Sequence, residues 1–208
     1  MPYAQEIASS CDLLLLQEHW LLGCQRELLH RYFDGWYNTN ACIDDANPMS
    51  QHCLPRGWGG VAILWRKSIN HLIRRTASDS QRFTAITLHQ GNARPTLLVC
   101  AYFPSGNGAA KKTEYHTTLA QLHAFLEQFG SHDIIIAGDF NMDVHKQTYM
   151  KDARRTALVN SMDEAGLRQM VPQSGPTMRA HNGRDESFID LVFASSEQRC
   201  CNLQRLRG

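Results

Sequence analysis

Apolar positions along the chain follow two spacings, and these divide the sequence into helices and strands. An apolar residue every three or four positions predicts a helix, whereas a short bulky run bounded by turn residues predicts a strand. The predicted helices cover about 22–31, 113–129 and 151–165, and the predicted strands 12–17, 60–65, 83–89, 96–102, 134–139 and 188–194. Segments 37–57 and 172–184, rich in turn residues, are predicted loops. Helices interleaved with strands exclude all-α and all-β classes and indicate an α/β fold.

The strand run Ile134–Ala137 ends in Gly138, Asp139, Phe140 and Asn141. Asp139 and Asn141 are two residues apart, so on an extended backbone they are expected on the same side of the chain. A carboxylate can take a proton from water and an amide can donate to a charged oxygen, which suits hydrolysis of a phosphate ester. The alternative is a structural turn that Asp139 begins and in which Asn141 bonds its own backbone.

Three other apolar runs lead to residues that could join this site. One run ends at Glu18, a second ends at Tyr102, and a third carries Asp190 within it. An unpaired carboxylate is unfavourable inside an apolar strand, so these acids favour a functional interpretation. Together with Asp139 they could converge on one hard cation, because such cations prefer oxygen ligands.

Five short motifs in this order resemble those of the endonuclease/exonuclease/phosphatase superfamily. They are Leu-Leu-Gln-Glu-His-Trp at 15–20, Gly-Gly-Val-Ala-Ile-Leu at 59–64, Ala-Tyr-Phe-Pro-Ser at 101–105, Ala-Gly-Asp-Phe-Asn at 137–141 and Ser-Phe-Ile-Asp at 187–190. Within the superfamily the chain is most similar to the apurinic-type endonuclease domains of non-LTR (LINE-type) retrotransposons. The resemblance spans nearly the whole chain. It implies a four-layer α/β sandwich of the DNase-I-like kind, with two packed β-sheets and outer helices.

The resemblance also implies a role for each candidate residue. Glu18 matches the family's ligand of the catalytic Mg²⁺, which Mn²⁺ could replace, and Tyr102 matches a tyrosine that contacts the scissile phosphate. Asp139 matches the residue that prepares the attacking water, and Asn141 the one that stabilises the phosphorane oxygens. Asp190 matches the aspartate that holds a catalytic histidine. Gln17 falls on the opposite face of its strand and is expected to be structural.

Two departures from the family pattern concern the ends of the motif set. The family's first strand, which carries an asparagine, and its closing Ser-Asp-His motif have no counterpart in this sequence. The chain is therefore expected to be a fragment of the domain, truncated at both ends and impaired as a nuclease. We expect it to nick plasmid more slowly than a version extended to restore both motifs. No histidine, the nearby His145 included, is expected to partner Asp190.

Composition and charge set broad limits. With 208 residues, 43% of them hydrophobic, the chain can bury a real core and is expected to form a single domain over 1–208.

No apolar run is long enough to span a membrane, and residues 1–16 lack the pattern of a signal peptide, so an intracellular location in cytoplasm or nucleus is expected. The net charge of +1 gives no bulk attraction to nucleic acid. The local pairs Arg74–Arg75, Lys111–Lys112 and Arg154–Arg155, and a group of Arg199, Arg205 and Arg207, are expected on the solvated surface.

Cysteine and histidine could in principle indicate a metal site of another kind. The seven cysteines form no Cys-x-x-Cys pair and are expected to be reduced thiols. The ten histidines are scattered, which argues against zinc. His19 follows Glu18 and should face away from it, and His116 and His123 fall on a helical stretch.

The sequence therefore predicts a Mg²⁺-dependent phosphodiesterase that nicks DNA, with a reverse-transcriptase domain in the parent polyprotein. Two alternatives stay open. One is another phosphoesterase of the superfamily, acting on RNA, inositol phosphates or lipid headgroups. The other is a non-catalytic remnant of the domain.

Overall fold

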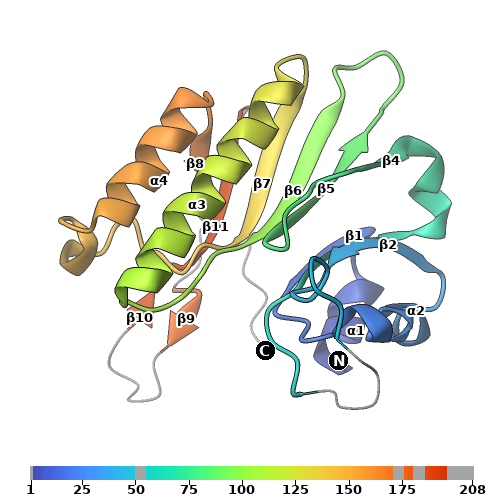
Figure 1. Cartoon of the computed structure of the whole chain (residues 1–208). Coiled ribbons are helices and arrows are strands. Elements are labelled where there is room, and N and C mark those ends of the chain that lie inside the picture. Colours follow the sequence, from blue (N-terminus) through green and yellow to red (C-terminus); the bar gives the residue numbers. More distant parts are fainter. Residues whose placement is uncertain (1, 50–54, 171–175, 180–185, 196–208) are drawn as a thin grey trace. The chain divides into compact units, whose positions relative to one another are not determined.

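The computed structural model describes residues 2–49, 55–170, 176–179 and 186–195 (Figure 1). The chain divides into two compact units, one ending at Tyr102 and the other beginning at Phe103. Among the residues that the structure describes, no helix is both long and apolar enough to cross a membrane.

The first unit contains a three-stranded antiparallel sheet in the order β1-β3-β2. Its strands are β1 (Leu13–Gln17), β2 (Trp36–Ala41) and β3 (Val61–Arg66). In the central strand β3, five of the six residues are buried, as expected for a strand covered on both faces. Side chains alternate between the two faces, so one set points toward helices and the other toward a second sheet.

Helices α1 (Pro2–Ser9) and α2 (Glu27–Tyr32), with the short 3-10 helix η1 (Gly23–Gln25) before α2, accompany this sheet. Leu14 of β1 and Leu64 of β3 pack with Ala8 of α1 and Leu29 of α2 in one buried cluster, to which Trp36 of β2 also belongs. The apolar stripe of each short helix thereby covers one face of the sheet.

A second antiparallel sheet of the same unit consists of β4 (Ile73–Thr76), β5 (Phe83–Leu88) and β6 (Thr96–Tyr102), and the 3-10 helix η2 (Lys67–Leu72) leads into it. All seven residues of β6 are buried. The two sheets pack face to face: the Gln17 amide lies 3.1 Å from Cys100 Sγ, and the hydroxyls of Thr39 and Thr84 are 3.2 Å apart. Gln17 is thus an internal packing residue, as its position on the strand predicted.

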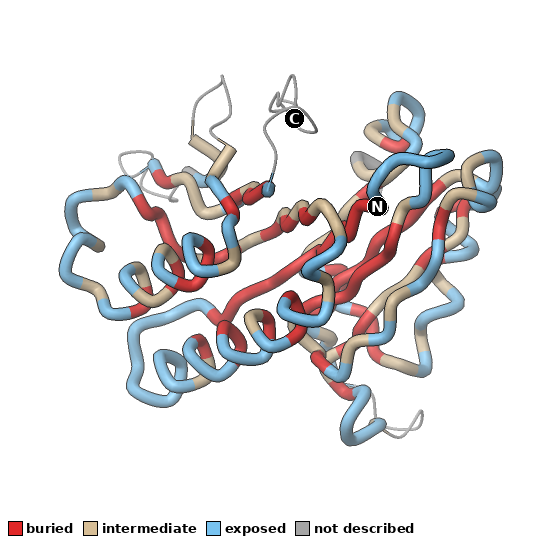
Figure 2. The backbone as a smooth tube through the Cα atoms, turned by 90° about the horizontal axis from the view of Figure 1, so that it is seen from above, coloured by how far each residue is buried: buried red, intermediate tan, exposed pale blue. Residues whose placement is uncertain are grey.

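The second unit contains β7 (Asp133–Asp139), β11 (Asp190–Ala194) and β8 (Arg168–Met170), with β11 paired antiparallel to both neighbours. Helices α3 (Ala109–Leu126) and α4 (Ala153–Glu164) lie side by side along these strands (Figure 1). Shorter elements complete it: η3 (Glu127–Phe129), η4 (Gln147–Tyr149), and the strand pair β9 (Met178–Arg179) and β10 (Glu186–Ser187). The buried side of α3 includes Leu119, Leu122 and Leu126, the stripe that the sequence predicts. The buried stretches of helix and strand stand out in Figure 2.

The predicted fold class, an α/β sandwich of two packed sheets with helices, is confirmed. Five strands differ from the prediction. β2 runs through the start of the predicted loop 37–57, β9 lies inside the predicted loop 172–184, and β4, β8 and β10 were not predicted at all. β2, β4 and β8 are edge strands, where short polar strands are common because they discourage pairing with other chains. Most of the predicted loop 172–184, and the group Arg199, Arg205 and Arg207, lie outside the described residues.

Candidate active site

Glu18 is presented to solvent by an unusual turn at the end of β1. Glu18 and Trp20 both have left-handed backbones, with φ of 52° and 58°, which non-glycine residues rarely adopt. Between them His19 points inward and is only 8% exposed, and its Nδ1 accepts a hydrogen bond from the Leu21 N–H at 3.1 Å. Such strained residues cost about 1–3 kcal/mol each and cluster at functional sites. In this turn Glu18 and Trp20 point to solvent, and His19 between them is buried.

The space for His19 depends on a neighbouring glycine. A Cβ added at Gly60 would lie 2.2 Å from the His19 ring, so only glycine fits there. Burial lowers the pKa of His19, which favours the neutral imidazole. The inward orientation that the sequence predicts for His19 is confirmed, and its hydrogen bond to Leu21 holds the turn.

Tyr102, at the end of β6, meets Glu18. The Tyr102 hydroxyl donates to Glu18 Oε1 at 2.5 Å, although the two residues are 84 positions apart. Tyr102 is 8% exposed, whereas Glu18 is exposed. The guanidinium of Arg82 lies 5.5 Å from the centre of the Tyr102 ring. An exposed carboxylate suits a hard divalent cation, and the phenol that donates to it holds it in one orientation.

In the second unit, Phe140 anchors the turn that carries Asp139 and Asn141. The Phe140 ring is fully buried, stacked on Phe103 with ring centres 4.9 Å apart and set edge-on to Phe193 at 5.2 Å. Asp139 and Asn141 on either side of it are both partly exposed. The buried ring fixes where its two polar neighbours stand.

The expectation of an extended backbone from Asp139 to Asn141 was wrong. Asn141 has a left-handed φ of 47°, and its N–H donates to Asp139 Oδ1 at 2.8 Å. The Asn141 side-chain amide also donates to the carbonyl of Phe103 at 2.9 Å. Asp139 thus begins a turn, as in the structural alternative, because it accepts from the backbone two residues on. The Asn141 side chain differs from that alternative, since it bonds Phe103 and not its own backbone. The turn and a chemical role are compatible, since a carboxylate has a second oxygen.

Asp190 lies directly opposite Asp139 in the register between β11 and β7. Residues opposite each other in an antiparallel pair share a face, with Cβ atoms about 4.5–5.5 Å apart. The Phe140 N–H donates to the carbonyl of Ile189 at 2.8 Å, which holds the two segments together. The prediction of an acid buried within an apolar strand was wrong: Asp190 is exposed and is the first residue of β11.

A supporting carboxylate, Asp143, was not predicted from the sequence. It is 3% exposed and accepts backbone N–H groups from His145 at 3.0 Å, Lys146 at 3.1 Å and Phe188 at 2.8 Å. It therefore ties the loop after β7 to the segment before Asp190. No local pattern distinguishes Asp143 from an ordinary loop aspartate, because its third partner is 45 residues away.

The structure groups the predicted site residues by unit. Glu18 and Tyr102 meet in the first, and Asp139, Asn141 and Asp190 lie together in the second. The convergence of all five on one cavity stays a prediction.

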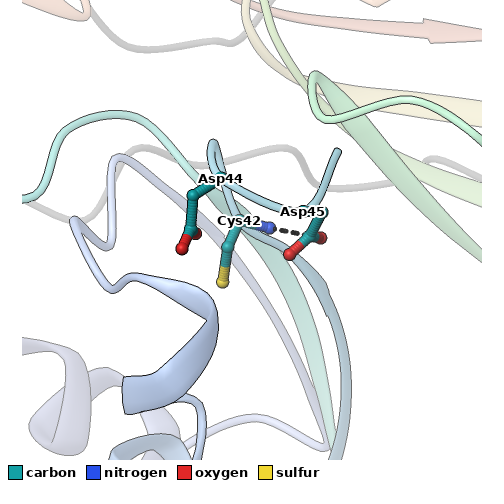
Figure 3. Close-up of side chains that lie close together, drawn as sticks. All are labelled: Cys42, Asp44 and Asp45. Carbon is teal, nitrogen blue, oxygen red and sulfur yellow. Dashed lines mark hydrogen bonds between the residues drawn. The ribbon is translucent and has the colours of Figure 1, made fainter. Parts of the chain in front are cut away.

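Cys42, Asp44 and Asp45 form a different cluster in the first unit, with ligand atoms within 4.8 Å of one another (Figure 3). Their carboxylates already have backbone partners: Asp44 accepts from Gly23 at 2.8 Å, and Asp45 accepts from Cys42 at 2.9 Å. Asp45 is also paired with the cation Arg26. Burial raises the pKa of the Cys42 thiol, which keeps it protonated and a poor ligand. Because its carboxylates are already bonded and its thiol is protonated, this cluster is a poorer Mg²⁺ site than the exposed Glu18 carboxylate. Its hydrogen bonds hold the loop after β2.

The four described cysteines, Cys11, Cys24, Cys42 and Cys100, are free thiols.

One of the basic pairs departs from the surface role that the sequence predicts. Arg154 is 2% exposed. Its guanidinium donates to Asp152 at 2.7 and 3.1 Å, to the Gly106 carbonyl at 2.7 Å and to Asn107 at 2.8 Å. Arg154 is a buried structural residue with four guanidinium hydrogen bonds, and the expectation that it lies on the solvated surface was wrong.

The packed sheets with their helices and the polar turns at strand ends define a DNase-I-like domain of the endonuclease/exonuclease/phosphatase superfamily, a class of nucleases and phosphoesterases. Residues 96–207 match the family described as endonuclease-reverse transcriptase, and since this is more than half of the sequence, the chain belongs to that family. A search of curated proteins with the sequence found no match.

Solved structures with the same fold include three nucleases. The endonuclease domain of TRAS1, a telomere-specific non-LTR retrotransposon, is 17% identical with a TM-score of 0.62, and the match covers 93% of this chain and 77% of that one. The 3'-5' exonuclease NExo of Neisseria meningitidis is 18% identical with a TM-score of 0.66, covering 93% and 81%. An AP endonuclease of Archaeoglobus fulgidus is 18% identical with a TM-score of 0.59, covering 93% and 79%. At these identities the likeness concerns the fold.

Proposed function

We propose that this protein is a Mg²⁺-dependent endonuclease of retrotransposon type that nicks one strand of DNA. The observation that carries the proposal is the turn in which buried Phe140 holds Asp139 and Asn141 outward, opposite Asp190. Membership of the endonuclease-reverse transcriptase family supports the reaction class. The fold neighbours support DNA as substrate, since the structure of the 3' phosphatase NExo from Neisseria contains a product DNA hairpin.

In this proposal Asp139 takes or directs the proton of the attacking water, because a carboxylate within reach of water is a competent base. Asn141 donates an amide N–H to the oxygens on which negative charge develops. Asp190, on the strand next to Asp139, keeps the local charge negative and orients its neighbours. Asp143 acts only through position, by holding both loops.

Glu18 is the proposed ligand for Mg²⁺ or Mn²⁺, with Tyr102 orienting its carboxylate through their hydrogen bond. An exposed carboxylate oxygen is a hard donor of the kind that these ions prefer. Bound there, the ion would neutralise charge on the phosphate and on the leaving oxygen. A reverse-transcriptase domain in the parent polyprotein would use the nick, and such a role fits a protein of the cytoplasm or nucleus.

The test is nicking of supercoiled plasmid in Mg²⁺, followed as conversion to the open circle. We expect nicking by the wild type, none in EDTA, and a loss of at least about 10²-fold in Asp139→Asn, because the substitution removes the base while keeping its shape. Asp163→Asn, at an exposed aspartate of α4, is the matched control and should nick at the wild-type rate. Equal rates for Asp139→Asn and wild type would refute the proposal.

A further inference from the structure

Two tryptophans stand out on the surface of the first unit. Trp20 is 42% exposed and Trp58 is 45% exposed, whereas the other two tryptophans, Trp36 and Trp65, are 7% and 2% exposed. An indole ring gains much from burial, so two of them left in solvent on adjoining segments indicate a surface that meets a partner.

The two segments that carry these rings are fastened to each other. The Trp20 N–H donates to the Gly59 carbonyl at 2.9 Å. A Cβ added at Gly57 would lie 1.7 Å from the Trp20 carbonyl oxygen, so the close approach requires glycine at that position. Trp58 lies between these two glycines and is therefore held beside Trp20 by its own backbone. The pair is built into the fold rather than left on a loose loop.

This aromatic pair adjoins the proposed metal ligand. Trp20 follows Glu18 by two residues, and both take the left-handed backbone around buried His19. The position of a Cβ at Gly59 lies 3.5 Å from Tyr102 Cε1, and Tyr102 in turn bonds Glu18. The strained turn thus directs a carboxylate and an indole to the surface together.

Arginine side chains lie over the aromatic rings of this region. The guanidinium of the exposed Arg56 lies 4.3 Å from the centre of the Trp20 ring, and that of Arg82 lies 5.5 Å from the Tyr102 ring. A guanidinium over an aromatic face can also reach a phosphate, because its N–H groups lie in the plane of the cation. Planar rings beside guanidinium groups are the combination that binds nucleic acid strands through bases and phosphates at once.

We propose that Trp20 and Trp58 form a stacking surface for an unpaired nucleobase next to the bond that is cut. The preferred substrate is then a nucleic acid with a single-stranded or locally unpaired stretch at that position, rather than a perfect duplex. Bases in a duplex are stacked on each other and offer no face to an indole, whereas unpaired bases do. That the base lies beside the cut rests on the proposed function. That the base binds at all rests only on the two exposed indole rings.

Binding is tested separately from cleavage by using the Asp139→Asn protein throughout. A fluorescein-labelled single-stranded DNA oligonucleotide and the same sequence as a blunt duplex are titrated with protein, and anisotropy gives each Kd. We expect tighter binding of the single strand. Trp20→Ala and Trp58→Ala should each weaken it by about 5- to 100-fold, with the duplex little affected. Intrinsic fluorescence of the exposed tryptophans should be quenched by the single strand.

Three controls make the result decisive. Trp58→Phe keeps an aromatic face and should recover most of the affinity. Tyr32→Ala, at a ring 41% exposed on α2, removes a comparable surface aromatic and should leave binding unchanged. Each indole is more than half covered, so the melting temperature of every variant should be checked and should stay well above the temperature of the titration. Weaker binding then reports the lost ring rather than unfolding. Unchanged single-strand binding in Trp20→Ala and Trp58→Ala, or equal binding of single strand and duplex, would overturn the inference.

The outcomes also separate this inference from the proposed function. If Asp139→Asn abolishes nicking while the tryptophan variants bind normally, the endonuclease proposal stands and the stacking surface is wrong. If the single strand binds through both tryptophans while the wild type fails to nick in Mg²⁺, the stacking surface stands and the endonuclease proposal is wrong.

Discussion

At the scale of single residues, Glu18-His19-Trp20 and Asp139-Phe140-Asn141 share one arrangement. In each, a buried ring separates two outward-facing residues, and at least one of these has a positive φ. The alternation was predictable, since neighbouring side chains point in opposite directions. The left-handed backbone was not, because Glu and Trp avoid it by local preference. Contacts distant in sequence, with Gly59 and Gly60 in the first case, impose it.

The buried imidazole of His19 predicts a pH-dependent stability. Its pKa is lowered from 6.5 by burial, so below about pH 6.5 the unfolded chain binds a proton that the folded chain resists. Stability should therefore fall as pH drops from 7.5 to 5.5, and the dependence should be shallower in His19→Asn. Asparagine is the matched replacement because its amide oxygen can accept the Leu21 N–H without titrating.

Urea midpoints of both proteins at the two pH values measure this difference. His19 contributes at most about 1.4 kcal/mol per pH unit, and the nine other histidines are common to both proteins. Parallel losses of stability in wild type and His19→Asn would contradict the account of His19 as a neutral anchor.

At the scale of elements, the strands that the sequence missed differ physically from those that it predicted. β6 and β7 are buried or half-buried along their length and consist mainly of apolar residues. An apolar run of this kind can be recognised from the sequence alone. β2, with its Asn-Thr-Asn sequence, and the charged β4 owe their structure to pairing with β3 and β5. Strand propensity depends on cross-strand neighbours, which local sequence does not contain. The start of α4 is local, since Asp152 caps it by accepting from the Arg154 N–H.

The guanidinium of Arg154 ties the start of α4 to the loop at Gly106 and Asn107, so its loss should destabilise the second unit. Arg154→Ala removes four guanidinium hydrogen bonds and leaves Asp152 and the Gly106 carbonyl without them. We expect a loss of about 3 kcal/mol in the free energy of unfolding, the range for breaking a buried ion pair. Arg154→Lys should recover only part, because an ammonium cannot reproduce the bidentate contact with Asp152.

Chemical denaturation measures the effect, with Lys151→Ala, at an exposed lysine one residue before the cap, as the control. A loss no larger in Arg154→Ala than in Lys151→Ala would show that the buried guanidinium is not a structural tie.

At the scale of the whole molecule, the sequence predicted the fold class and the residues at the strand ends, because both follow from motif order and apolar runs. It did not predict the supports of the site, such as Asp143, or the compact division of the chain after Tyr102. Both depend on contacts between distant segments. The proposed reaction requires Glu18 as the ligand of the divalent metal ion.

The dependence of the nicking rate on Mg²⁺ concentration tests this requirement most directly, using wild type, Glu18→Gln and Cys42→Ala. Glu18→Gln removes the charged ligand and should raise the Mg²⁺ concentration that gives half-maximal rate at least about tenfold. Mutation of residues that only support a metal site already lowers metal affinity by about that factor. Cys42→Ala, in the competing cluster, should match the wild type. A wild-type Mg²⁺ dependence in Glu18→Gln, with the shift in Cys42→Ala instead, would contradict the account.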